Sequence, residues 1–274
     1  MSTIPPSPQP DQTPERWNNH VSVYEAVFEP FSVAFARAAF DAIGLKAGMR
    51  VLDVGAGSGG AALELAARGC RAAAIDASPA MVARICERAS EHGVAVEACV
   101  MDGQCLEFPP SCFDAAISIF GVILFPDAVR GLAEMRRVVQ PGGRVAVVTW
   151  TEPQHYELAI ELRAAVQAVK PDTPPSALPA QLRFRERDDF IALFRAAGFD
   201  TPKIEVRSET LVSPSARWLG DRLRFAPGMA AQLEGLGALA DAATERFVST
   251  VEAKWGTGPT QFTGKAFIGT ALVP

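Results

Sequence analysis

The chain has 274 residues, of which 49% are hydrophobic and 21% are charged. This balance is typical of a globular protein and excludes a largely disordered chain, and the length suits one α/β domain that carries an insertion. The formal net charge of -5 and the lack of a long basic run argue against a nucleic-acid partner, because such binding depends on neutralising phosphates.

Three further features narrow the class of protein. The longest apolar run, residues 115–125, is about half as long as a membrane-spanning helix requires, so we expect no membrane span. Residues 1–15 show no secretory signal pattern, and their prolines and polar residues predict a disordered tail. The five cysteines form no C-x-x-C pair and there are only three histidines, so we expect reduced thiols, a cytoplasmic protein and no metal site.

After the tail, residues 16–274 are expected to form a single domain. Residues 16–43 show helical spacing, and Pro30 divides them into two helices that we expect to form a lid. Strands are then predicted over residues 50–56, 71–78, 94–102, 113–120 and 144–150, and helices over 59–69, 79–93 and 126–140. This alternation indicates a parallel sheet with helices on both faces. Ligands bind such sheets at the carboxyl ends of the strands.

The pattern changes after Trp150. A helix is predicted over residues 156–169, followed by a proline-rich stretch, a helix over 187–198 and a strand over 203–212. Residues 213–236 are irregular and partly helical, and we expect them to form a cap inserted over the strand ends. A helix over 238–256 and a strand over 264–273 complete the chain.

The stretch VLDVGAGSGG, residues 51–60, predicts a strand that turns into a helix through a glycine loop. Gly55, Gly57 and Gly60 satisfy the dinucleotide pattern G-x-G-x-x-G, and Asp76 follows at the distance of a ribose-binding acid. Asp76 suits an adenosyl cofactor equally well. The loop and this acid alone therefore leave a dinucleotide and an adenosyl ligand both open.

Further residues favour the adenosyl ligand. Asp53 lies beside the loop, where a carboxylate would suit an ammonium group better than a pyrophosphate. Asp102 and Gln104 end the third strand, where they would meet the ribose and adenine. A nicotinamide-dependent oxidoreductase of the tyrosine–lysine type is disfavoured, because neither Tyr24 nor Tyr156 begins a Tyr-x-x-x-Lys motif.

The segments VLDVGAGSG, AIDAS, MDGQ, FDAAISIFGVILFPD and RVVQPGGRVAVV lie in order within residues 50–150. They resemble class I S-adenosylmethionine-dependent methyltransferases, of the group that includes quinone C-methyltransferases and natural-product enzymes. The resemblance implies a Rossmann-like fold with a seven-stranded, mostly parallel sheet whose last strand is antiparallel. It also implies S-adenosylmethionine as cofactor, with S-adenosylhomocysteine as the product, bound by Asp53, Gly55, Ala56, Gly57, Ser58, Gly59, Asp76, Ala77, Ser78, Met81, Asp102, Gly103, Gln104, Ile119 and Phe120. Met81 suits helix core packing equally well.

The acceptor side is less defined by sequence. The tetrapeptide IFGV stands where methyltransferases of nucleobases and amides carry an N-P-P-Y-type motif, which favours C- or O-methylation of a small apolar or aromatic molecule. If a general base is needed, the candidates are His155, which follows Trp150, and His20 and Tyr24. Residues expected to contact the acceptor are Trp17, Phe28, Trp150, Tyr156, Trp218, Arg222 and Phe225. A methyltransferase-like protein that binds the cofactor without transferring methyl remains an alternative, and the oligomeric state is open.

Overall fold

Seven strands form one sheet at the centre of the molecule, in the order β3-β2-β1-β4-β5-β7-β6. The computed structural model describes residues 8–172 and 178–274. The strands are β1 (Arg50–Val54), β2 (Arg71–Asp76), β3 (Val96–Val100), β4 (Phe113–Ile119), β5 (Val139–Trp150), β6 (Lys203–Ser213) and β7 (Thr260–Leu272). β1 to β5 pair in parallel, and β7 runs antiparallel to both β5 and β6. This arrangement confirms the predicted Rossmann-like sheet with an antiparallel last strand.

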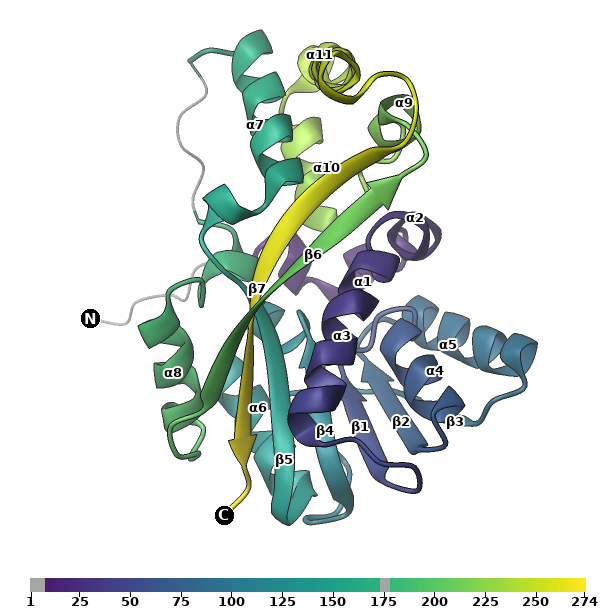
Figure 1. The fold of residues 1–274 in the computed structure, drawn as a ribbon, viewed down its shortest axis with the longest axis vertical. Helices are drawn as coiled ribbons and strands as arrows, with labels where there is room; N and C mark the ends of the chain where they lie inside the picture. The colour runs from purple at the N-terminus through teal and green to yellow at the C-terminus, as the bar shows by residue number, and fades with distance from the viewer. Residues whose placement is uncertain (1–7, 173–177) are drawn as a thin grey trace.

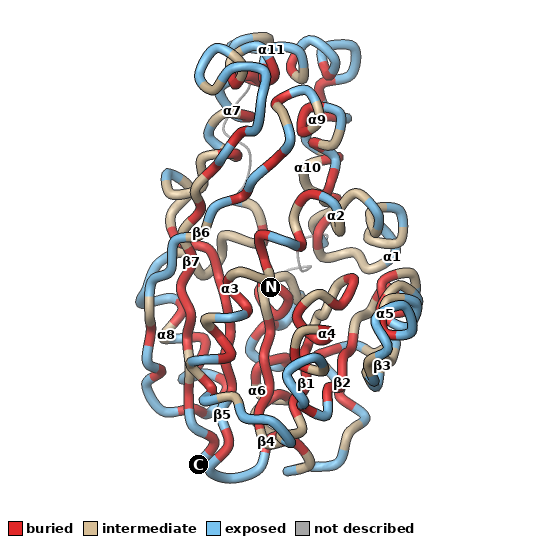
Figure 2. The backbone as a smooth tube through the Cα atoms, turned by 45° about the vertical axis from the view of Figure 1, so that its right-hand side comes forward, coloured by how far each residue is buried: buried red, intermediate tan, exposed pale blue. Residues whose placement is uncertain are grey.

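Helices cover both faces of the sheet, which explains why its inner strands are apolar on both sides. In Figure 1, α3 (Glu29–Ile43) passes in front of the sheet and α6 (Ala128–Val138) lies behind it. α4 (Gly60–Ala67) and α5 (Pro79–His92) pack beside α3 on β1, β2 and β3, and α8 (Arg187–Ala196) packs against α6 and β7. Figure 2 shows the buried backbone running through the strands and α3.

The amino-terminal helices meet where the sequence placed their boundary. α2 (Val21–Val27) ends just before α3, and Pro30 stands in the first turn of α3, where a proline costs no hydrogen bond. The carboxyl ends of the parallel strands face these helices.

An upper lobe, formed by α7 (Glu157–Val169), α9 (Ala216–Gly220), α10 (Pro227–Glu234) and α11 (Ala240–Trp255), lies beyond the sheet at the top of Figure 1. The long strands β6 and β7 extend up to it. The upper lobe is larger than the cap predicted over residues 213–236. It also includes α7 and α11, which lie outside that range and pack against each other. Their facing apolar residues include the buried side chains of Leu158, Leu162, Val248 and Val251.

The predicted disordered tail and the predicted end of one helix both differ from the structure. Residues 8–15 are ordered, with a short helix η1 (Pro10–Gln12) and the start of α1 (Pro14–Trp17). They are held because the Gln9 amide group bonds the backbone of Leu178 and Ala180. Residues 1–7 lie outside the described residues, as do residues 173–177 of the proline-rich stretch.

The helix predicted over residues 126–140 ends earlier, at Val138. Val139 instead pairs with Phe113 of β4, so β5 begins before the Pro141 turn rather than after it. In the described part of the chain, no helix is both long enough and apolar enough to cross a membrane.

Candidate functional site

The glycine loop after β1 is held by the carboxylate that ends β2. Asp76 Oδ2 accepts a hydrogen bond from the Gly57 N–H at 2.9 Å, and its Oδ1 accepts one from the Ser78 N–H at 2.8 Å. Gly57 has φ +57°, and a Cβ built on it would lie 3.2 Å from the Tyr24 ring. Burial raises the pKa of Asp76 to about 6. The backbone of Ala77 also bonds this carboxylate, and since a carboxylate has about four acceptor positions, Asp76 keeps capacity for a ligand.

Asp53 is a buried carboxylate without a hydrogen-bond partner. It is 1% exposed, and neither of its side-chain oxygens accepts a hydrogen bond. Burial, together with the negative charges of Asp76 and Glu29, raises its pKa to about 7. An unpaired buried charge is costly, so this carboxyl group suits either a proton or a positively charged ligand group.

A cavity of about 420 Å³ opens at the carboxyl ends of the strands. Ten of the fifteen predicted cofactor residues line it: Gly55, Gly57, Asp76, Ala77, Met81, Asp102, Gly103, Gln104, Ile119 and Phe120. Asp53 and Ala56 line a much smaller cavity instead, and this shares Tyr24, Gly55 and Ile119 with the larger one. The larger cavity therefore holds most of the predicted cofactor site.

Ser58, Gly59 and Ser78, which were also predicted to contact the cofactor, line neither of these two cavities. The Ser58 hydroxyl donates to Glu29 Oε1 at 2.6 Å, and Ser78 caps the first turn of α5 by accepting from the Met81 N–H. Gly59 packs against α5, where a Cβ would come within 2.8 Å of Ile85. These residues shape the loops from behind rather than facing the cavity.

The other half of the cavity is aromatic. Trp150, at the end of β5, stacks on Phe120 at 4.4 Å and on Tyr156 at 4.6 Å between ring centroids. Phe28 stacks on Phe225 from the upper lobe at 5.7 Å, with the rings only 9° from parallel. All five line the cavity, as do Trp17 and Tyr24. Five of the seven predicted acceptor residues thus surround one space.

The backbone after β4 is strained where it meets this aromatic wall. Phe120 has φ +59°, a left-handed conformation that a bulky residue rarely adopts. The turn is fixed because the Ser118 hydroxyl donates to the Val54 carbonyl and accepts from the Val122 N–H. Strain of this kind gathers at functional sites, where the surrounding structure enforces it.

Four predicted residues lie away from the cavity. The His155 ring contacts Thr151 Oγ1 and Glu152 Oε2, and His20 Nδ1 lies 2.7 Å from the Arg16 carbonyl. Arg222 packs its guanidinium over the Trp218 ring, 4.5 Å from its centroid. Of the predicted bases, only Tyr24 reaches the cavity.

Sequence reasoning missed lining residues from several parts of the chain. They are Asp11, Gln12 and Pro14 of the amino-terminal segment, Ile75 of β2, Met101 after β3, Gly121, Ile123, Leu124, Phe125 and Pro126 after β4, and Gln181, Ala226 and Met229 further along the chain. The run Thr13-Pro14-Glu15 carried a usable signal, because a cap residue followed by proline and an acid marks a helix start.

All charged residues among the described lining residues of the cavity are acidic. Its charged residues are Asp11, Asp76 and Asp102, and no lysine, arginine or histidine is among the described lining residues. No group of three or more potential metal-ligating side chains occurs within residues 8–172 and 178–274. The wall therefore suits a ligand with positive or hydrogen-bond-donating groups at one end and apolar bulk at the other.

Comparison with known proteins agrees with this geometry. Residues 51–143 match the family model of the methyltransferase domain. An uncharacterised protein of Mycobacterium tuberculosis is 36% identical over 138 residues, 50% of each chain. A demethylmenaquinone methyltransferase of Thermus thermophilus is 34% identical over 128 residues, 46% of this chain and 58% of its own. The chain thus spans about half the length of the curated relatives it matches.

Comparison with solved structures extends the similarity in fold to the full chain. The solved structure of the 4+2 cyclase SpnF covers 100% of this chain and 99% of its own, with a TM-score of 0.60 and 23% identity. At this identity the match speaks for the fold alone, and the fold includes the upper lobe as well as the sheet.

Proposed function

We propose that this chain, which belongs to the class I methyltransferases, transfers a methyl group from S-adenosylmethionine to a carbon or oxygen atom of a small apolar or aromatic acceptor. The observation that carries the proposal is the division of a single cavity. One half presents a glycine loop and carboxylates, and the other presents stacked aromatic rings. A cofactor and an acceptor would therefore lie against each other in one enclosed space.

The residues present fit this cofactor. The unpartnered Asp53 carboxylate suits an ammonium group, and Asp76 and Asp102 would accept hydrogen bonds from hydroxyl and amino groups. Gly57 leaves room beside Tyr24 that a side chain would fill. When bound, S-adenosylmethionine supplies a methyl group already activated on a sulfonium. The protein then has to orient the acceptor and exclude water, which can contribute about 7–11 kcal/mol in favourable cases.

The cavity side chains are suited to orientation rather than to strong base catalysis. Burial and the nearby Glu29 carboxylate raise the pKa of the Tyr24 hydroxyl above its ordinary value, and burial does the same for Tyr156. Both hydroxyls therefore keep their protons at neutral pH and can only donate or accept hydrogen bonds. The stacked Trp150, Phe120 and Tyr156 rings would hold a flat acceptor and keep water from it.

The charge of the wall points to an acceptor without an anionic group. A phosphate or carboxylate would meet Asp11 and find no basic partner among the described lining residues. Arg222, which was among the residues expected to contact the acceptor, does not line the cavity. The relationship to a demethylmenaquinone methyltransferase supports an aromatic acceptor, and the five free cysteines support a reducing, cytoplasmic setting.

A transfer assay tests the proposal. The protein is incubated with methyl-labelled S-adenosylmethionine and a panel of phenols, catechols and hydroquinones, with hydroxybenzoates as anionic comparators. We expect label in at least one neutral acceptor, with an equal amount of S-adenosylhomocysteine formed and lower rates for the hydroxybenzoates.

A cofactor-binding protein that transfers no methyl is the second candidate, and it is favoured by the full-length likeness to a structure named as a cyclase. The fold by itself does not specify the reaction. Tight cofactor binding without transfer to any neutral member of the panel would contradict the first proposal and support this one.

A further inference from the structure

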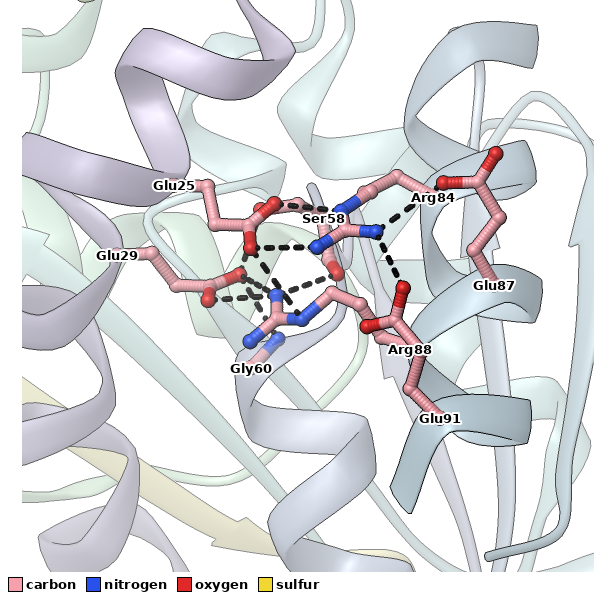
Figure 3. A network of polar contacts seen from close by, with 8 residues as sticks. All are labelled: Glu25, Glu29, Ser58, Gly60, Arg84, Glu87, Arg88 and Glu91. Atoms are coloured by element: carbon pink, nitrogen blue, oxygen red, sulfur yellow. Dashed lines mark hydrogen bonds and ion pairs between the residues drawn. The ribbon is translucent and has the colours of Figure 1, made fainter. Parts of the chain in front are cut away.

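A buried carboxylate from the amino-terminal helices bonds the back of the glycine loop (Figure 3). Glu29, the first residue of α3, is 6% exposed, and its Oε1 accepts from the Ser58 hydroxyl at 2.6 Å and from the Gly60 N–H at 3.0 Å. Gly60 begins α4, whose first N–H groups have no partner within the helix. Glu29 therefore provides the acceptor that the sequence of the loop itself does not supply.

Arg88 of α5 neutralises Glu29 and bonds the loop as well. Its Nη1 donates to both Glu29 oxygens, at 2.8 and 2.6 Å, and to the Ser58 carbonyl at 2.8 Å. The packing is tight, since a Cβ on Gly60 would lie 2.7 Å from Glu29 Cδ. Three elements, α3, α4 and α5, thus meet on two loop residues directly behind the cavity.

A second ion pair joins the same amino-terminal helices to α5 without touching the loop. Glu25 of α2 accepts from Arg84 at 2.8 and 3.0 Å, and Arg84 also pairs with Glu87 and Glu91 on the outer face of α5. Figure 3 shows both pairs side by side. Glu25 Oε1 also lies 3.7 Å from Arg88 Nε, a longer contact than those of Glu29. The chain therefore contains a matched control: Glu25 and Glu29 both attach the helices to α5, but only Glu29 accepts hydrogen bonds from loop atoms.

We infer that Glu29 is a positioning residue for cofactor binding. It acts through Ser58 and Gly60 to hold the loop in the conformation in which the Gly57 N–H meets Asp76. It also fixes the start of α3, and with it the Tyr24 ring that lies against Gly57. The amino-terminal helices would then be a fixed wall of the cofactor site rather than a lid that opens. This inference rests on the proposed function.

Matched truncations separate positioning from helix attachment. The dissociation constant of S-adenosylhomocysteine is measured by calorimetry for the wild type, Glu29→Ala and Glu25→Ala, and the melting temperature is recorded for each. Loss of charge-assisted hydrogen bonds predicts a rise of about tenfold or more for Glu29→Ala. For Glu25→Ala we expect a change below about twofold. Glu29→Gln keeps an oxygen that can accept from Gly60 and should recover part of the affinity.

The outcomes decide the inference. Equal increases for Glu29→Ala and Glu25→Ala, or no increase for Glu29→Ala, would overturn it, since both variants loosen the same helices. Should Glu29→Ala fail to fold, Ser58→Ala decides: an increase of about threefold supports the inference, and an unchanged affinity overturns it. Wild type that binds no S-adenosylhomocysteine would overturn the proposed function and this inference together, whereas binding without methyl transfer would overturn only the transfer.

Discussion

The two halves of the cavity are built in different ways. The polar half uses backbone N–H groups and carboxylates at the carboxyl ends of β1, β2 and β3, in chain order. The aromatic half brings together rings from four distant parts of the chain: Trp17 and Phe28, Phe120, Trp150 and Tyr156, and Phe225. Hydrogen bonds define the first half and ring packing defines the second.

This difference separates affinity for the cofactor from choice of acceptor. Directional groups fixed by the sheet suit a ligand that is the same in every reaction of this kind. Apolar rings on helices and loops tolerate substitution and suit a ligand that varies. Variants in one half should therefore leave the other half's ligand largely unaffected.

Asp76→Ala should give the largest effect, because it removes a ligand partner and the acceptor of the Gly57 and Ser78 N–H groups. We expect the dissociation constant of S-adenosylhomocysteine to rise about 100-fold, the equivalent of two hydrogen bonds to a charged group. Calorimetric titration measures this dissociation constant. Asp102→Ala serves as a comparator, for which we expect a smaller increase. Unchanged affinity in Asp76→Ala would show that the polar half is not the cofactor site.

Asp53 should make cofactor binding depend on pH. Its carboxyl group holds a proton up to a pKa of about 7 in the ligand-free protein, and an ammonium group favours the carboxylate, so binding releases the proton. The dissociation constant should therefore fall about tenfold as the pH rises from 6 to 7.5. Asp53→Asn should reduce that change to about twofold, the part expected from Asp76, whose pKa is about 6. A wild-type affinity that is constant across this range would contradict the assignment.

The same raised pKa affects the ligand-free fold. Between pH 3.8, the ordinary pKa of an aspartate, and about 7, folded Asp53 binds a proton that the unfolded chain releases. The free energy of unfolding should consequently decrease as the pH rises through this window, and more steeply than in Asp53→Asn. Urea titrations at several pH values would detect this difference.

Phe225→Ala tests the aromatic half. The ring stacks on Phe28 and lines the cavity, so its loss would remove apolar surface from the proposed acceptor half. We expect the KM for an identified aromatic acceptor to rise about fivefold to tenfold, as expected for a lost aromatic contact. The affinity for S-adenosylhomocysteine should stay within about twofold. A larger loss of cofactor affinity than of acceptor affinity would reverse the assignment of the two halves.

Asp11→Ala tests how the amino-terminal segment is attached to the upper lobe. Asp11 Oδ1 accepts from the Gly228 N–H at 2.7 Å in the first turn of α10, so the variant leaves that donor unpaired. Loss of such a cap should lower the free energy of unfolding by about 1 kcal/mol in urea denaturation. Glu15→Ala, an exposed acid of the same segment, should be neutral, and an equal effect of both variants would exclude a specific attachment.

His155→Ala should have the smallest effect. The ring contacts Thr151 and Glu152 outside the cavity, so we expect an initial transfer rate within about twofold of the wild type. A loss of about tenfold or more would restore His155 as the base and would require a rearrangement of the segment after β5.

Sequence alone predicted the polar half well because its positions follow from the periodicity of strands and helices. Asp76 and Asp102 were placed at strand ends, and the structure brings both to the cavity. Periodicity could not show that the Ser58 and Ser78 hydroxyls bond other parts of the chain, because it says where a loop lies and not which way each side chain points. Their partners Glu29 and Asn18 lie 29 and 60 residues away along the chain.

For the aromatic half, the sequence predicted which aromatic residues were available but not how they are arranged. The sequence indicated which rings were available, but their meeting depends on long-range packing such as the Asp11–Gly228 contact, which spans 217 residues. Trp218 and Phe225 looked alike in sequence, yet one lies under Arg222 and the other enters the cavity. The size of the upper lobe was missed for the same reason, since long-range packing and the Lys254–Glu161 ion pair join α7 to α11.

The most direct test of the central claim is a calorimetric titration of the wild-type protein with S-adenosylmethionine, S-adenosylhomocysteine and NADH in parallel. We predict one-to-one binding of both adenosyl ligands and no binding of NADH. Binding of NADH without either adenosyl ligand would contradict the account, because it would assign the glycine loop and Asp76 to a dinucleotide instead.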